Sequence, residues 1–359
     1  MRSRIRAAFL AVLALIAVPM PAGAWDYPGH RMVGSIADLV LQQHHPATHK
    51  RLGELLETKL PGGLWQKRSL REVAVFPDCA KKGNEPFCGR PSSEEEKDYA
   101  EHNQHHSTYH FTDVPLQQPK YTASSAGTED TDVVQMINYT VAQLRAKTPS
   151  ERPEKKGVKL TDTEAVWLLA HLVGDIHQPL HVGAKYFDKD TGCEASVDPN
   201  GGGHPPKFGI GDTVAMTMGG NLIYLVAPPP AVPPAENLHL FWDGATVVRA
   251  MQAAGLGHSE QDFAKQLAAA PPAGWETAGG AETWAAQWAT EIMPLAAEAH
   301  DRLTIRKGPM PSPFSFTGGC TWVTALDPTY EDWAKERAKT QLAKAGFRLA
   351  ALFKAIFEP

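Results

Sequence analysis

The chain has 359 residues, of which 43% are hydrophobic and 21% charged, and its formal net charge at pH 7 is -5. This acidic balance argues against a protein that binds nucleic acid along an extended basic surface. After the first 24 residues no stretch approaches 18 consecutive apolar residues, so we expect no membrane anchor. The length permits two domains, yet no linker divides the candidate functional residues, which favours one domain with long loop insertions.

The amino-terminal segment 1–24 predicts a secretory signal peptide. Three arginines precede an apolar run, and Ala22-Gly23-Ala24 offers an A-x-A cleavage site. We therefore expect a secreted or periplasmic protein whose mature domain covers residues 25–359. The free amine and carbonyl of Trp25 could then chelate a metal together with His30, but these residues alone favour the simpler interpretation that His30 only opens the helix 29–44.

Most of the long segments predict helices, because apolar residues recur in them at a spacing of 3.6. The predicted helices cover residues 29–44, 49–58, 129–147, 161–178, 238–254, 258–268, 278–305 and 329–356. Alternating β patterns are scarce, and the clearest is Asn221–Val226. The expected fold class is therefore all-α, with long irregular loops at 183–218 and 225–236.

Four cysteines in an exported chain suggest two disulfides, with three possible connectivities. Proximity favours Cys79–Cys88, which leaves Cys193–Cys320. Because no C-x-x-C pair exists, a thiolate zinc site or a thioredoxin-like redox motif is not expected.

The predicted helix 161–178 carries the most informative residues. His171 and Asp175 are four positions apart and project to one side of an apolar helix, as metal ligands must. His177 falls nearly opposite Asp175, so we leave it out of the candidate ligands. Pro179 should end the helix and let His181 return toward the same site.

The same spacing occurs a second time, in His239 and Asp243. One His-x3-Asp pair can be a core histidine bonded to a nearby acid, but two pairs in apolar segments favour a metal centre. Imidazole and carboxylate donors suit zinc, whereas calcium prefers oxygen ligands alone.

Two further candidate ligands precede the central helix. The segment Glu101–Asp113 is rich in histidines, most of which we expect to be solvated. His110 is the exception, because it lies beside Phe111 at the more apolar end. Asp78 follows an apolar run in the same way.

Taken together, the chain resembles the S1/P1 nuclease family of secreted zinc enzymes over almost its whole mature length. The resemblance rests on Trp25 followed by His30, His110-Phe111-Thr112-Asp113, His171-x3-Asp175-x5-His181 with Gln178-Pro179-Leu180, Gly219-Gly220-Asn221, Asn237-Leu238-His239-x2-Trp242-Asp243, and the last helix around 341–350. It implies a mainly helical domain that holds three zinc ions at the bottom of a cleft. One zinc would be bound by Asp78, His110, His171 and Asp175, a second by Trp25, His30 and Asp175, and the third by His181, His239 and Asp243.

The resemblance also implies an activity. Zinc lowers the pKa of water and so supplies a nucleophile for in-line attack on phosphorus. The expected enzyme is an endonuclease that hydrolyses single-stranded DNA and RNA to 5′-phosphate products and also cleaves 3′-nucleotides. Asp78, Asp175 and Lys81 are the expected catalytic residues, and three zinc ions would attract phosphodiesters despite the acidic net charge.

Substrate contacts follow from the same resemblance. Phe111 is expected to stack on the nucleobase and Asp113 to accept hydrogen bonds from it, with Asn221 as a further contact, although Phe111 could instead be a core residue. An extended backbone should send Phe111 to a neighbouring wall and return Asp113 to the side of His110. The family usually has Arg three residues after the ligand acid, where this chain has Lys81, a point charge without the bidentate fork.

Two other functions compete with this interpretation. A zinc-dependent phospholipase C shares the terminal Trp and the His-x3-Asp-x5-His core, but its last pair ends in Glu where this chain has Asp243. A secreted zinc-sequestering protein would saturate each metal with ligands, whereas the third site implied here keeps open positions. Serine hydrolysis is not expected because there is no G-x-S-x-G, and we expect a monomer.

Overall fold

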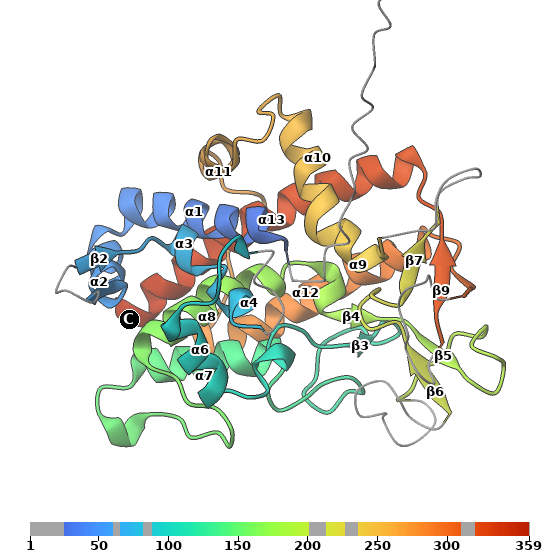
Figure 1. Ribbon diagram of the computed structural model, residues 1–359, viewed down its shortest axis with the longest axis horizontal. Coiled ribbons are helices and arrows are strands. Elements are labelled where there is room, and N and C mark those ends of the chain that lie inside the picture. The colour runs from blue at the N-terminus through green and yellow to red at the C-terminus, as the bar shows by residue number, and fades with distance from the viewer. Residues whose placement is uncertain are drawn as a thin grey trace, which may run out of the picture.

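Helices build most of the molecule, as the all-α prediction requires (Figure 1). The computed structural model describes residues 25–59, 65–81, 88–200, 213–226, 236–309 and 320–358. Its longer helices are α1 (Tyr27–His44), α2 (Pro46–Leu55), α7 (Val133–Arg145), α8 (Asp162–Asp175), α10 (Thr246–Ala253), α11 (Glu260–Ala268), α12 (Ala281–Asp301) and α13 (Pro328–Phe357). Each predicted helix therefore has a counterpart, with ends shifted by a few residues.

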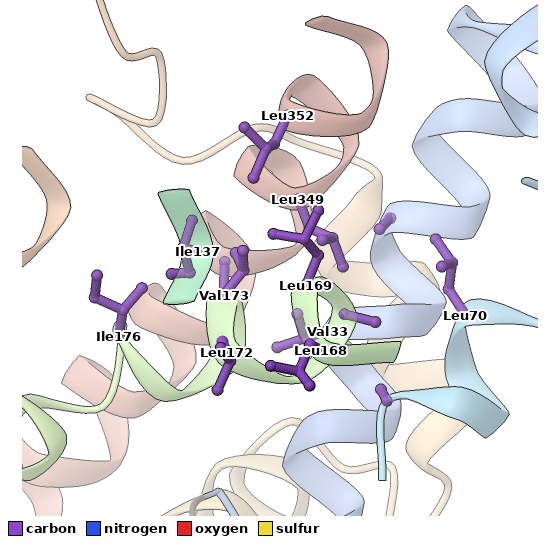
Figure 2. Close-up of a cluster of buried hydrophobic side chains, with 14 of the residues drawn as sticks. Val33, Leu70, Ile137, Leu168, Leu169, Leu172, Val173, Ile176, Leu349 and Leu352 are labelled. Carbon is purple, nitrogen blue, oxygen red and sulfur yellow. The ribbon is translucent and has the colours of Figure 1, made fainter. Parts of the chain in front are cut away.

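Helix α8 lies at the centre of the main hydrophobic core. Its first turn is closed by a capping box, in which Thr161 and Glu164 satisfy each other's backbone N–H groups. Figure 2 shows its apolar side chains surrounded by Val33 of α1, Ile137 of α7 and Leu349 of α13. Because apolar residues cover α8 on every side, any polar group on this helix must find its partner inside the protein.

The central helix ends at Asp175, three residues before the predicted end at 178. The short 3-10 helix η3 (Pro179–His181) follows directly, with Pro179 at its first position. The prediction that Pro179 turns the chain is confirmed, and the turn brings His181 back beside the end of α8.

Three short helices were not predicted: α3 (Leu70–Val73), α4 (Phe76–Cys79) and α6 (Glu94–His102). Helices α3 and α4 have four residues each, too few to display an apolar repeat, and α6 is almost entirely polar, with Tyr99 and Ala100 as its only apolar residues. Capping boxes start α3 and α6, from Ser69 and Ser93 respectively. Helix α4 is the most important of the three for the candidate metal ligands, because it carries Asp78.

The predicted helix 238–254 is interrupted in the structure. A short helix α9 (Leu238–Leu240) runs into a π-helical turn, Phe241–Ala245, before α10 begins. A π-turn accommodates one extra residue per turn and is frequent at functional sites. Here it contains Asp243.

Short strands gather at one end of the molecule, away from α2 (Figure 1). They are β5 (Tyr186–Asp188) paired with β6 (Val214–Met216), and a sheet in which β9 (Trp322–Thr324) lies between β7 (Ile223–Leu225) and β8 (Arg306–Lys307). The predicted strand Asn221–Val226 corresponds to β7. Two smaller pairs complete the described strands: β1 (Glu57–Lys59) with β2 (Trp65–Lys67), and β3 (Val114–Pro115) with β4 (Gly183–Ala184).

A second hydrophobic cluster fills the space between these strands and the helices. Phe241 and Trp242 of the π-turn pack there with Trp322 of β9 and Tyr330 of α13. The Trp242 indole donates to the Tyr330 hydroxyl over 3.0 Å, and that hydroxyl donates to the Ala299 carbonyl. The π-turn is thereby anchored on the strand-bearing side of the molecule.

The two disulfides join Cys79 to Cys88 and Cys193 to Cys320, so the connectivity favoured by proximity is confirmed. The first follows Asp78 directly and ties the end of α4 to the chain before α6. The second ties the turn after β5 to the residue two positions before β9. The second disulfide belongs to the second hydrophobic cluster, whereas the first lies beside the candidate ligand Asp78.

Among the described residues no helix is both long and apolar enough to cross a membrane. The predicted signal peptide, residues 1–24, lies outside the described residues. Parts of the two predicted loops, residues 201–212 and 227–235, also lie outside them.

Candidate metal centre

The pair on α8 has the geometry that its spacing predicts. His171 Nε2 and Asp175 Oδ2 lie 3.3 Å apart, and both side chains are fully buried. A buried His–Asp pair of this kind could be a simple hydrogen bond in the core, so the neighbouring side chains decide whether the site can hold a metal.

Asp78 and His110 join the α8 pair to form the first cluster. His110 Nδ1 lies 2.9 Å from His171 Nε2, 3.1 Å from Asp175 Oδ2 and 3.7 Å from Asp78 Oδ1. Ligand atoms of a tetrahedral zinc site at about 2.0–2.1 Å from the ion lie about 3.3 Å from one another. The spacing of these four atoms fits a bound ion better than it fits four independent hydrogen bonds.

A second cluster shares His171 and Asp175 and adds His30 from α1. His30 Nε2 lies 3.2 Å from Asp175 Oδ1, and neither atom makes a hydrogen bond to any other residue in the described part of the chain. The His30 ring stacks on His171 with ring centroids 3.7 Å apart. The two oxygens of Asp175 therefore face different clusters, as a bridging carboxylate requires.

Close packing of α1 on α8 makes this approach possible. A Cβ on Gly174 would lie 2.9 Å from His30 Nδ1, so any larger residue would push His30 away. Trp25 is fully buried beside it, and its indole donates to the Gly174 carbonyl over 2.8 Å. The start of α1 is thus held against the end of α8, next to Asp175.

The third cluster contains His181 of η3, His239 of α9 and Asp243 of the π-turn. The two Nε2 atoms lie 3.0 Å apart, and His239 Nε2 lies 3.4 Å from Asp243 Oδ2. Asp243 Oδ2 is buried and has no hydrogen-bond partner among the described residues. Such an atom is costly to bury alone, which favours a cation at this position.

Backbone carbonyls set the tautomer of three candidate histidines. Nδ1 of His171 bonds to Ala74 O, Nδ1 of His181 to His110 O, and Nδ1 of His239 to Gly219 O, at 2.6, 2.7 and 2.8 Å. A carbonyl only accepts, so each Nδ1 must carry the proton and each Nε2 lone pair faces its cluster. Metal-binding histidines are commonly oriented by such a second hydrogen bond.

Gly219 has a special role in this support. Its φ is +54°, and a Cβ there would collide with the Leu180 carbonyl. Only glycine allows this approach without strain. Its N–H donates to Asp113 while its carbonyl accepts from His239, so one residue supports two neighbouring parts of the site.

The electrostatics of the first two clusters favour a bound cation. Burial works to raise the pKa of Asp175, but His171, His110 and His30 outweigh it and hold the pKa well below its ordinary value. Burial lowers the pKa of His30 to about 4 and that of His110 to about 3, so both imidazoles are neutral at pH 7. Ionised carboxylates and neutral imidazoles are the forms that bind metals.

Lys81 lies at the edge of the first cluster. Its ammonium group donates to Asp78 Oδ1 over 2.6 Å, and its side chain is 18% exposed. Burial opposes ionisation of Asp78, yet Lys81 and His171 together lower the pKa of that carboxyl. A partly exposed cation beside the clusters is in a position to meet an anionic group that approaches them.

The third cluster has a different electrostatic setting. Burial raises the pKa of Asp243 well above its ordinary value, and the charges of Asp175, Asp26 and Asp78 raise it further. The hydrogen bond from Gln178 opposes these effects. Burial also lowers the pKa of His239 to about 3.

Phe111 and Asp113 line one pocket close to the clusters, together with Thr108, Gly127, Glu129, Asp132 and Met216. Phe111 is partly exposed and belongs to none of the hydrophobic clusters found among the described residues. The expectation that Asp113 returns to the side of His110 was wrong. Side chains alternate along extended backbone, so residues 111 and 113 share a side.

Asp113 is buried in this pocket, 3% exposed, and burial raises the pKa of its carboxyl to about 7 despite the hydrogen bond from Gly219. Asn221 is placed differently. Its amide donates to Met218 O over 2.9 Å within its own turn, and it does not line the Phe111 pocket.

The remaining histidines lie apart from the clusters. His177 is buried, bonds to Val173 O and lies 3.0 Å from a nitrogen of Arg348, which agrees with its exclusion from the candidate ligands. His102 and His105 are exposed, as expected for the histidine-rich segment. His106 was expected to be solvated but is buried against Tyr99.

One supporting residue was given no role from the sequence, where it was noted only as part of Gln178-Pro179-Leu180. Gln178 is fully buried and bonds directly to Asp243 over 2.7 Å. The carbonyl partners of the histidines have no side-chain signal at all.

Three adjoining groups of buried His and Asp side chains can therefore each hold a metal ion. A protein-family model described as S1/P1 Nuclease matches residues 25–358 of the chain. No curated protein matches it.

Proposed function

Because the chain belongs to the S1/P1 nuclease family, we propose that it is a zinc-dependent endonuclease of single-stranded DNA and RNA. It would release 5′-phosphate products and also hydrolyse 3′-nucleotides. The observation that carries this proposal is the junction of the first two clusters at Asp175, whose two oxygens face different candidate ions. A carboxylate shared in this way suits the paired metals of phosphodiester hydrolysis.

The proposed zinc ions take the donors of the three clusters. Asp78, His110, His171 and Asp175 would hold the first, and His181, His239 and Asp243 the third. The second would take His30, Asp175 and the amine and carbonyl of Trp25, provided that the chain is cleaved after Ala24. Bound zinc would activate water for attack on phosphorus.

The chain's own residues would bind and orient the substrate. Lys81, partly exposed beside Asp78, would contact a phosphate as a point charge. Phe111 would stack on a nucleobase in the pocket that Asp113 also lines, and Asp113 would accept a hydrogen bond from the base. Unpaired strands can present a base to such a pocket, whereas a duplex cannot without unstacking. Asn221 would contact the substrate only if its side chain left Met218.

We also infer that residues 25–359 act as one secreted or periplasmic domain, without a membrane anchor and as a monomer. Two disulfides support an oxidising compartment. Cleavage after Ala24 would remove three arginines and change the net charge from -5 to -8, so binding would be limited to the metal centre while the rest of the surface repels nucleic acid.

The test is an assay of purified mature protein on single-stranded DNA, RNA, a 3′-nucleotide and a short-chain phosphatidylcholine, with zinc measured in the same sample. We expect three zinc ions per chain, one for each cluster, and hydrolysis of the first three substrates. Hydrolysis of the lipid alone would indicate a phospholipase C. Three tightly held zinc ions without any hydrolysis would indicate a sequestering protein, and one zinc or none would refute the trinuclear centre.

A further inference from the structure

Gln178 lies where the central helix, the η3 turn and the third cluster meet. It is fully buried, and both ends of its amide are used. Its Nε2 donates to Asp243 Oδ1 over 2.7 Å, and its Oε1 accepts from the Leu180 N–H over 2.5 Å.

The Leu180 bond fixes which way the amide faces. A backbone N–H only donates, so the atom that meets it must be the amide oxygen. The NH2 group must then point at Asp243. Pro179 has no N–H, which makes Leu180 the first donor of η3 and Gln178 the N-cap of the turn that carries His181.

The bond from Gln178 occupies one carboxylate oxygen of Asp243 and leaves the other oxygen available to bind a metal. Oδ1 accepts from Gln178, whereas Oδ2 has no hydrogen-bond partner among the described residues and lies 3.4 Å from His239 Nε2. The hydrogen bond from the NH2 group therefore fixes the orientation of the carboxylate, with Oδ2 facing His239.

We propose that Gln178 is a positioning residue for the third metal, because it orients Asp243 and caps the turn that carries His181. This inference rests on the proposed zinc centre. One side chain thereby aligns two of the three ligands of the third cluster, although it touches no candidate ion itself.

The tertiary setting makes this support more important than it would be in the first cluster. Among the described residues, Asp243 has ion-pair contacts with His181 and His239, and no lysine or arginine contacts it. Asp78 of the first cluster, in contrast, contacts a lysine directly. A donor held in place before the metal arrives lowers the cost of binding.

Two variants separate the contact with Asp243 from the cap of the turn. Gln178→Met has a similar length and removes both hydrogen bonds. Gln178→Glu keeps the shape and the acceptor for Leu180, but it faces Asp243 with a second acidic group in place of a donor.

The matched control is Gln143→Met. Gln143 on α7 is also buried, 3% exposed, and also donates to a carboxylate, Asp162 Oδ1, over 3.0 Å. It lies in none of the clusters, so its loss tests the general effect of removing a buried glutamine.

Zinc content after dialysis and competition with a chromophoric chelator give the readout, and melting temperature is measured alongside. We expect the wild type and Gln143→Met to hold three zinc ions. Both Gln178 variants should bind two normally and the third roughly 10- to 100-fold more weakly, the usual effect of losing an orienting partner.

The alternatives are distinguishable. Wild-type affinity for all three ions in Gln178→Glu would overturn the role of the Asp243 contact, whatever Gln178→Met does. Loss of all three ions in both variants, with melting that the Gln143 control does not share, would show a general structural role instead. A wild type with fewer than three ions would refute the zinc centre itself, and not this inference alone.

Discussion

The helical body and the strand-bearing side of the molecule hold their candidate metals in different ways. The first two clusters belong to the helical body, where α1, α4 and α8 carry ligands around the main core. The third belongs to the boundary with the strands, where η3, α9 and the π-turn pack on the second hydrophobic cluster.

The difference lies in how each region stabilises a buried carboxylate. In the helical body, three histidines and Lys81 hold Asp175 and Asp78 ionised, so the acids are ready for a cation. At the boundary, burial raises the pKa of Asp243, and the hydrogen bond from Gln178 opposes this rise. In the first two sites, neighbouring charges and hydrogen bonds keep the carboxylates ionised. In the third site, a hydrogen bond orients the carboxylate.

Asp175→Ala should have the largest effect, because the two clusters of the helical body share this residue. We expect zinc content to fall from three to one, because Asp175 contacts His110 and His171 of the first cluster and His30 of the second. We expect kcat/KM to fall by more than about a hundredfold, the upper limit for an orienting partner. Elemental analysis and a single-strand assay measure both.

His177→Ala is the control for that variant. It should keep all three zinc ions, because the ring contacts Val173 and Arg348 and not a cluster. Its stability should fall by about 1–3 kcal/mol, the cost of leaving a buried partner unsatisfied. Equal zinc loss in Asp175→Ala and His177→Ala would contradict the conclusion that Asp175 belongs to the metal centre and His177 does not.

An extra residue retained before Trp25 should have the next largest effect. An amide nitrogen cannot replace the free amine as a metal donor, so we expect loss of the second zinc and of most turnover while the third site is unaffected. Full activity and three zinc ions in that protein would show that Trp25 contributes packing, through its bond to Gly174, and no ligand.

Phe111→Ala should change substrate binding without changing either metal region. Stacking on one base is worth about 1–3 kcal/mol, so we expect KM for single-stranded substrate to rise roughly ten- to a hundredfold. Zinc content and melting temperature should stay nearly unchanged, because the side chain is partly exposed and lies outside the hydrophobic clusters of the described residues. A large fall in melting temperature with the same KM would assign Phe111 to the core.

Asp113→Asn should have the smallest effect of these changes, and the effect should be seen only in how stability and KM depend on pH. Burial raises the Asp113 pKa from 3.8 to about 7, so the folded state holds this proton more tightly than the unfolded state does. The wild type should therefore lose stability as pH rises from 3.8 through about 7, and the variant should lack this component. If the base needs the ionised acceptor, wild-type KM should fall as pH rises through about 7, while KM of Asp113→Asn stays flat.

Thermal melts and KM measured from about pH 5 to 8 check this prediction, because that range spans the titration of the folded carboxyl. A wild-type KM that does not change near pH 7, or the same change in Asp113→Asn, would show that ionised Asp113 does not contact the base. Zinc content at each pH serves as the control, since loss of metal at low pH would also raise KM.

Local patterns in the sequence were sufficient to predict the long helices and to identify candidate ligands on them. Apolar periodicity located α8, and the i, i+4 spacing placed His171 and Asp175 on one side of it, because helix geometry fixes the direction of side chains four residues apart. The resemblance to a family, and not the spacing, grouped Asp78 and His110 with them. The structure then brought all four within a few ångströms.

Only the tertiary structure decided how those ligands are supported. The supporting contacts join residues that are far apart in the chain. They are the hydrogen bonds of His171 to Ala74 O, of His239 to Gly219 O and of Gln178 to Asp243, and the close approach of His30 to Gly174. A backbone carbonyl leaves no side-chain signal, and a buried glutamine looks like any other in the sequence. The π-turn at Asp243 was not predicted for a related reason. Its apolar pattern is helical, and the contact between Trp242 and Tyr330 joins residues that are far apart in the chain. Residue identity thus determined which donors exist, whereas packing between distant segments determined where each donor points.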